Sequence, residues 1–248
     1  MDYQDVLAEV GAGSAHPGGP ESTQLWMQEL SLTRDTEVLD IGCGTGRTLL
    51  NLNRQYGCSI TGVDIRPAML AKARLRAKRS RQVANWRLGS AERLPFRDGQ
   101  FDVVVAESVN VFTNPLRSIA EAHRVLKLAG SYVNVEMFLA APVNEEWFET
   151  LRGVYGVLHL PDLAGWKRYY RNAGFSHIRV LMTRPVQPYQ AWSGQQSNQP
   201  DENLSSPGVF QSPEVNKVLA DNAKWLEDNA KYVGYVISIA KKSGSIVN

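Results

Sequence analysis

Residues 37–136 alternate between short apolar runs and segments whose apolar residues recur at helical spacing. The run Val103-Val104-Val105 has no polar alternation, which is typical of a parallel strand covered on both faces. Pro67 opens one of the periodic segments, a position that suits the first turn of a helix. Strands that alternate with helices predict an α/β fold with helices on both faces of the sheet. The predicted strands are 37–41, 59–64, 84–88, 101–106 and 131–136, and the predicted helices are 46–56, 67–78 and 115–126.

Beyond residue 137 the pattern changes, and a sheet strand returns only after two helices. The last strand is expected to pair antiparallel with 175–181 and to close a doubly wound, mostly parallel, seven-stranded sheet. Residues 185–213 contain five prolines and many Gln, Ser, Asn and Gly, so we predict a long flexible insert within a single domain, 1–248. The remaining predicted elements are helices 145–156, 161–173 and 214–228 and strands 175–181 and 232–239.

The segment before the first strand is apolar but interrupted. Residues 1–10 read as a helix with Val6, Leu7 and Val10 on one side, and a glycine-rich loop separates it from a second helix, 21–30. Such a segment is expected to fold back over a ligand site as an N-terminal helical lid, residues 1–35. A plain N-terminal cap is the alternative.

The composition narrows the class of protein. The chain has 248 residues and is 43% hydrophobic, which suits one domain with a sizeable core, and its net charge of +2 favours neither a polyanion nor a membrane surface. Cys43 and Cys58 are too few for a disulfide framework. The N-terminus carries Asp2, Asp5 and Glu9, and no apolar run approaches the ~20 residues of a membrane span. We expect a soluble cytoplasmic protein, a monomer or homodimer, with no membrane contact.

Three alternate glycines follow the first predicted strand. Gly42, Gly44 and Gly46 permit a tight turn without Cβ atoms, and the helix that follows directs free backbone amides at whatever binds there. Asp64 ends the second strand, where a carboxylate accepts hydrogen bonds from both hydroxyls of a ribose. The spacing G-x-G-x-G differs from the G-x-G-x-x-G of dinucleotide sites. A nucleoside ligand is therefore favoured, and an oxidoreductase is the less favoured alternative.

Four motifs in order, VLDIGCGTG, TGVDIRPAML, GSAERLPFRDGQFDVVVAES and RVLKLAG, resemble those of class I S-adenosylmethionine-dependent methyltransferases. The likeness is to the small-molecule, ubiquinone-methyltransferase-like type and covers residues 36–138. It implies a Rossmann-like fold, S-adenosylmethionine as the cofactor and a small-molecule methyl acceptor. We expect the lid and the substrate-side helices, 139–174, to enclose that acceptor.

The resemblance also implies roles for individual residues of the cofactor site. Asp40 and the backbone of Gly42, Cys43 and Gly44 would hold the methionine end, and Glu107 would line the same pocket. Asp64 would bind the ribose.

On the adenine side, Ile65 would pack against the ring, and Ser90, Ala91 and Glu92 would lie at its edge. Ser90 replaces the aspartate that is usual in the family.

Two residues are candidates for catalysis. His16, in the lid loop, would act as a base or bind the cofactor, or else would only shape its turn. Glu136, with Asn134, is polar in a central strand, so it would contact the substrate or form a structural hydrogen bond. No carboxylate cluster has the spacing of a metal site, so no metal is expected.

Other functions remain open. The basic residues on and after the predicted helix 67–78 are interpreted as a solvated face, so no nucleic-acid partner is expected. The alternatives to a small-molecule enzyme are a nucleic-acid or protein methyltransferase and a cofactor-binding accessory protein without turnover. These basic residues are Lys72, Arg74, Arg76, Lys78, Arg79 and Arg81.

Overall fold

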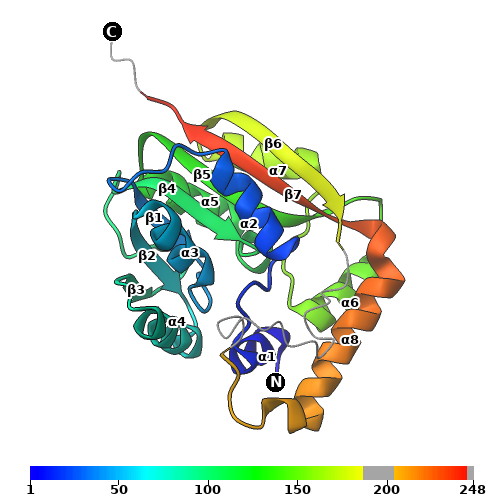
Figure 1. Ribbon diagram of the computed structural model, residues 1–248. Helices are drawn as coiled ribbons and strands as arrows, with labels where there is room; N and C mark the ends of the chain where they lie inside the picture. The colour runs from blue at the N-terminus through cyan, green and yellow to red at the C-terminus, as the bar shows by residue number, and fades with distance from the viewer. Residues whose placement is uncertain (187–203, 245–248) are drawn as a thin grey trace.

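A seven-stranded sheet in the order β3-β2-β1-β4-β5-β7-β6 forms the centre of the computed structural model, which describes residues 1–186 and 204–244 (Figure 1). Strand β7 runs antiparallel to both of its neighbours, and the pairs from β3 to β5 are parallel. The predicted mostly parallel sheet with an antiparallel last strand is confirmed. The strands are β1 (Glu37–Ile41), β2 (Ser59–Asp64), β3 (Asn85–Leu88), β4 (Phe101–Glu107), β5 (Leu126–Leu139), β6 (Phe175–Pro185) and β7 (Val233–Lys242).

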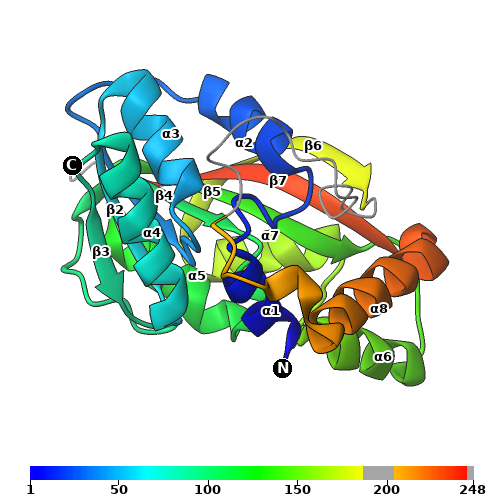
Figure 2. The ribbon, with the colours of Figure 1, turned by 60° about the horizontal axis from the view of Figure 1, so that its bottom comes forward.

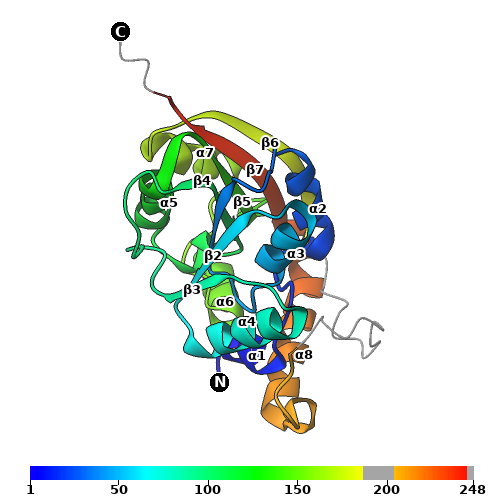
Figure 3. The same cartoon turned by 60° about the vertical axis from the view of Figure 1, so that its left-hand side comes forward.

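Helices cover both faces of this sheet. Figure 3 shows α5 and α7 on one side and α2 and α3 on the other, with α4 beside α3. Helices α1, α6 and α8 gather beyond one end of the sheet (Figure 2). The helices are α1 (Tyr3–Val10), α2 (Gly19–Gln28), α3 (Arg47–Tyr56), α4 (Pro67–Ser80), α5 (Pro115–Val125), α6 (Glu145–Tyr155), α7 (Leu163–Asn172) and α8 (Pro213–Asn229), and the short 3₁₀ turns are η1 (Asn110–Phe112), η3 (Val209–Gln211) and η4 (Ala230–Tyr232).

Local sequence signals account for most helix ends. Side-chain oxygens at the N-caps accept hydrogen bonds from free amides of the first turn, which an isolated helix leaves unsatisfied. Helix α1 has a complete capping box, formed by Asp2 and Asp5, and ends at Gly11 in the left-handed conformation. The other side-chain caps are Asn114 of α5, Asn144 of α6, Asp162 of α7 and Ser212 of α8.

The centre of the sheet is the core of the molecule. Val103, Val104 and Val105 of β4 are all buried, as predicted for a strand covered on both faces. The order of the strands reverses between β1 and β4, whose carboxyl ends leave a crevice in open α/β sheets. The glycine turn follows β1, so the fold brings it to this crevice.

Two segments differ from the prediction. Strand β5 already begins at Leu126, because the chain passes from α5 into the sheet without a separate loop. Most of the predicted insert, 187–203, lies outside the described residues. Its later part packs on α1, where the Leu204 amide donates to Gly11 O over 3.0 Å and the Ser206 amide donates to Glu9 O over 2.9 Å.

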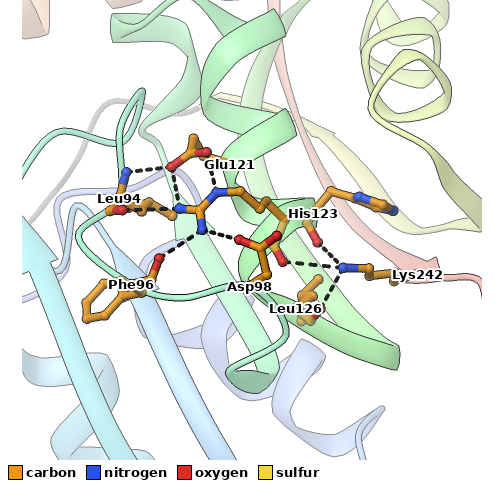
Figure 4. Close-up of polar contacts among 8 residues, drawn as sticks. Leu94, Phe96, Asp98, Glu121, His123, Leu126 and Lys242 are labelled. Carbon is orange, nitrogen blue, oxygen red and sulfur yellow. Dashed lines mark hydrogen bonds and ion pairs between the residues drawn. The ribbon is translucent and has the colours of Figure 1, made fainter.

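The carboxyl end of α5 is held by two cationic side chains (Figure 4). Lys242 of β7 donates from Nζ to His123 O over 2.8 Å and to Leu126 O over 2.7 Å. These contacts satisfy carbonyls that the end of a helix leaves free and place a positive charge at the negative end of its dipole. Arg124 binds the loop before β4 through Leu94 O, Phe96 O and Asp98, and binds Glu121 within the helix.

We expect Lys242→Met to lower the free energy of unfolding by about 1–2 kcal/mol, because the last carbonyls of α5 lose their charged donor. Urea denaturation measures this loss. Lys241→Met is the matched control, since Lys241 Nζ donates to the Ser131 hydroxyl and not to a helix end. An equal loss in both variants would contradict the capping role.

Candidate functional site

The turn after β1 is hydrogen-bonded to β2, and its backbone at Gly44 is not covered by other atoms of the chain. The amides of Gly42 and Cys43 both donate to Val63 O, over 2.7 and 3.1 Å. A Cβ on Gly42 would lie 2.5 Å from a methyl group of Val109, whereas a Cβ on Gly44 would meet no atom within 4 Å. Gly44 has a φ of +51°. The missing side chain of Gly44 therefore leaves open space at a turn whose backbone favours glycine.

That open space belongs to a cavity of about 410 Å³. The structure brings all ten residues predicted to bind the cofactor to its lining, together with His16 of the lid loop. They come from the carboxyl ends of β1, β2 and β4 and from the loop after β3, which meet because the strands are parallel and adjacent. The ten are Asp40, Gly42, Cys43, Gly44, Asp64, Ile65, Ser90, Ala91, Glu92 and Glu107.

Four carboxylates belong to the polar part of this lining, namely those of Asp40, Asp64, Glu92 and Glu107. Asp40 is buried, and burial raises its pKa well above the usual range, with Glu107 and Asp64 raising it further by repulsion. Asp64 accepts the Gly44 amide over 2.9 Å and the Arg66 amide over 2.8 Å, but burial still raises its pKa. A positively charged ligand would relieve this clustering of acidic groups.

Glu107 joins the N-terminal segment, residues 1–35, to the sheet. Its Oε1 accepts hydrogen bonds from Thr23 Oγ1 over 2.7 Å and from Trp26 Nε1 over 2.8 Å, both from α2. Its Oε2 accepts from Thr48 Oγ1 of α3 over 2.7 Å and lies 3.4 Å from His16 Nε2. One carboxylate thus joins the loop 11–18, α2, α3 and β4. The loop, α3 and β4 contribute residues to the lining of the cavity.

The residues on the predicted adenine side differ in what their side chains contact. Ile65 is 67% exposed, so an apolar face is free for a planar group. Glu92 Oε1 accepts the Asn114 amide over 2.9 Å, and Ser90 Oγ accepts the Glu92 amide over 3.2 Å. Glu92 and Ser90 therefore also stabilise the loop that forms this wall.

Glu136, predicted as a catalytic residue, is not among the lining residues. It is fully buried, and its Oε1 accepts the amides of Val109 and Asn110 over 2.8 and 2.5 Å. Burial raises the pKa of Glu136 to about 8, although these hydrogen bonds lower it. Glu136 thus forms hydrogen bonds that hold the turn after β4. A structural hydrogen bond was one of the two roles that the sequence analysis offered for this residue.

Stability should depend on pH through Glu136. The folded state retains the proton up to a pKa of about 8, whereas the unfolded chain releases it near the ordinary value of 4.5. Folding therefore takes up a proton between these values, and the contribution to stability, complete below 4.5, is lost as the pH rises towards 8.

We expect Glu136→Gln, which stays neutral, to lack this loss. The unfolding free energy of the variant relative to the parent should rise with pH, by up to about 1.4 kcal/mol per pH unit. Urea denaturation at several pH values tests this, with the exposed Glu149→Gln as a control. Parallel pH profiles for parent and Glu136→Gln would contradict the assignment.

Sequence reasoning missed one wall of the cavity. Helix α8 contributes five lining residues, and it packs against α6, where the Tyr155 hydroxyl donates to Asn222 O over 3.2 Å. The spacing of Val215, Leu219, Asn222 and Leu226 shows that one face of α8 is buried, but not which cavity that face borders. The lining residues of α8 are Leu219, Asn222, Ala223, Trp225 and Leu226.

Within residues 1–186 and 204–244, no helix has the length and apolar character needed to cross a bilayer. In the same ranges, His, Cys, Asp and Glu side chains form no group of three placed to hold a metal ion.

Comparison with known proteins identifies the family. Residues 39–134 match a methyltransferase domain. The chain is 31% identical to an uncharacterized methyltransferase of Bacillus subtilis over 183 residues, which are 74% of this chain and 78% of that protein. It is 32% identical to the ubiquinone/menaquinone biosynthesis C-methyltransferase of Citrifermentans bemidjiense over 145 residues, 56% of this chain and 60% of that one.

A solved structure shares the fold. Phosphoethanolamine N-methyltransferase 2 of Haemonchus contortus, in complex with S-adenosyl-L-methionine, superposes with a TM-score of 0.77 at 17% identity, covering 98% of this chain and 56% of that chain. The match to the methyltransferase domain and the 31% identity to the Bacillus subtilis methyltransferase show that the chain belongs to the class I S-adenosylmethionine-dependent methyltransferases of the small-molecule type, whose cofactor is S-adenosylmethionine. The family, the Rossmann-like fold and the cofactor predicted from the sequence are confirmed.

The residues present fit this cofactor. Its ammonium and sulfonium groups are positive, and Asp40, Asp64 and Glu107 all line the cavity. The space beside Gly44 admits a ligand against the backbone.

Proposed function

We propose that this methyltransferase binds its cofactor along the glycine turn and transfers the methyl group to a small acceptor held beneath α1, between α6, α8 and the turn after β4. One observation carries the proposal: a single cavity joins the carboxylates at the strand ends to an apolar wall formed by these other elements. The cavity extends into the molecule between helices, which suits a small metabolite. A folded macromolecular acceptor would need an open surface.

The cofactor supplies an electrophilic methyl group on its sulfonium, so the chain has mainly to align the acceptor. In this proposal Asp40 and Glu107 lie on the methionine side, Asp64 holds the ribose, and Ile65 packs on the adenine. Fixed orientation alone is worth effective molarities of roughly 10⁵ M or more. The lid, fastened through Glu107, excludes water from the reacting groups.

His16 is proposed to position the lid. Its Nε2 lies 3.3 Å from Thr23 Oγ1, and that hydroxyl donates its own proton to Glu107. The Thr23 oxygen is therefore available to accept a proton from Nε2, which directs the Nε2 proton towards Thr23 and Glu107. A ring held in this way is suited to fixing the lid loop against the cofactor.

We further propose that the protein works in the cytoplasm as a monomer or homodimer and does not act on nucleic acid. Two of its basic side chains around α4 support the last point, because they are engaged within the molecule. Lys72 Nζ donates to Glu9 O over 2.8 Å and to Leu204 O over 2.7 Å. Arg76 is buried and donates to Thr45 O over 3.1 Å.

The proposal is tested by incubating the protein with methyl-labelled S-adenosylmethionine and a low-molecular-weight metabolite extract. We expect label to appear in a small molecule. Tight cofactor binding without transfer to any component of the extract would favour an accessory protein and overturn the proposal.

Asp64→Ala should weaken cofactor binding by about 1–3 kcal/mol, because the hydrogen bonds to the ribose are lost. Titration calorimetry with S-adenosylmethionine measures the change. Asp102→Ala serves as the control, since Asp102 binds the Glu37 amide and Lys127 and does not line the cavity. Unchanged affinity in Asp64→Ala would mean that the ribose lies elsewhere.

His16→Ala should lower transfer of the label roughly 10- to 100-fold through misplacement of the lid, while the overall fold stays intact. His16→Gln should restore most of the activity, because an amide can still donate to Glu107 whereas it cannot act as a base. The exposed His159→Ala is the control. Normal transfer by His16→Ala would remove this role, and failure of His16→Gln to restore transfer would favour a base.

A further inference from the structure

The part of the cavity proposed for the acceptor is built of apolar and aromatic side chains. They come from the turn after β4, from the end of β5, from the residue that follows β6, and from α6 and α8. None of the described residues of this part carries a charge; they are Val109, Phe112, Thr113, Met137, Tyr155, Val186, Leu219, Asn222, Ala223, Trp225 and Leu226. A charged acceptor here would lose its hydration without a counter-charge from these residues.

The charged lining residues lie on the cofactor side. Asp40, Asp64, Glu92 and Glu107 come from the strand ends and the loop after β3. Arg66 follows β2 and forms ion pairs with Asp2 and Asp5 of α1. The charge of Arg66 is therefore matched by these two carboxylates.

Most polar groups of the apolar wall are satisfied within the chain. The Tyr155 hydroxyl donates to Asn222 O, and Trp225 Nε1 donates to Thr150 Oγ1 over 2.9 Å. The Thr113 hydroxyl lies 2.9 Å from Ser118 Oγ. These side chains present their apolar parts to the cavity without an unpaired donor.

Asn222 is different. Its side-chain nitrogen donates to Val154 O over 3.1 Å and to Val218 O over 3.2 Å, so both amide protons have acceptors. Its Oδ1 is buried and has no hydrogen-bond partner. The residue as a whole is 5% exposed and is one of those that line the cavity. Two carbonyl neighbours determine the orientation of the amide, because the reverse orientation would set oxygen against oxygen.

We propose that Asn222 determines acceptor specificity: its Oδ1 accepts a hydrogen bond from a hydroxyl or N–H group of an uncharged, largely apolar acceptor. A buried amide oxygen without a partner is unfavourable, and a ligand donor would satisfy it. Phe112, Tyr155 and Trp225 would bury the apolar remainder of the acceptor. This inference rests on the proposed function, since it assigns the acceptor to that cavity.

The test compares four probes that share one ring system: 2-naphthol, naphthalene, 2-naphthoate and 2-naphthylmethylammonium. Their affinities are measured for the full chain saturated with S-adenosylhomocysteine, which occupies the cofactor side without transferring a methyl group. We expect 2-naphthol to bind about five- to tenfold more tightly than naphthalene through the hydrogen bond to Asn222. Both ions should bind more weakly than naphthalene.

The variant pair isolates the amide oxygen. Asn222→Ala should reduce the preference for 2-naphthol over naphthalene to about one, whereas Asn229→Ala should keep it. Asn229 is the matched control on the same helix, because its Oδ1 accepts Trp147 Nε1 over 2.6 Å and its Nδ2 donates to Trp225 O. A residue that only supports the packing of α8 would change both affinities together and leave their ratio unchanged.

Three results would overturn the inference: an unchanged ratio in Asn222→Ala, equal binding of naphthalene and 2-naphthol to the parent, or binding of either ion as tight as that of 2-naphthol. The last two need no variant, so they decide even if Asn222→Ala does not fold. Failure of S-adenosylhomocysteine to bind would instead overturn the proposed function. Failure of 2-naphthol to bind the S-adenosylhomocysteine complex is a fourth result that overturns the inference, and it leaves the proposed function standing.

Discussion

The Glu107 carboxylate is the interaction on which the closed site depends. A buried carboxylate is unfavourable unless donors surround it, and here the donors come from segments far apart in the chain: Thr23 and Trp26 of the lid, Thr48 of α3 and the nearby ring of His16. The requirement to satisfy this one group therefore holds the lid against the sheet. Because Glu107 also lines the cavity, the same negative charge that binds the N-terminal segment is available to a cationic ligand.

The walls of the cavity are supported from behind by other buried polar groups. Glu136 binds the amides of the turn after β4, which keeps Val109 against Gly42 and gives the glycine turn its shape. On the far side, the Asn222 amide nitrogen and the Tyr155 hydroxyl tie α8 and α6 together. Since each support joins two elements, the dimensions of the site follow from the packing of the whole domain.

Sequence periodicity and local signals predicted the sheet, its antiparallel last strand and most helices, because each depends on nearby residues or on burial from both faces. The ends of the helices and strands depend also on residues that are distant in the chain. Strand β5 begins at Leu126 because the chain enters the sheet directly from α5, and Lys242 of a distant strand caps that helix. No local sequence pattern indicates a capping residue that lies 116 residues or more away in the chain.

In the sequence, four ordered motifs indicated the family and the cofactor, and the same resemblance implied the ten residues that line the cavity. Those residues lie at strand ends, in the glycine turn and in the loop after β3, which parallel neighbouring strands bring to one edge of the sheet. Only the tertiary structure decided that Glu136 supports a turn from outside the cavity, that Glu107 fastens the lid, and that α8 with Asn222 forms the remaining wall. The physical reason is that an amphipathic pattern shows which face of an element is buried, whereas the partner of that face is fixed only when distant segments pack together.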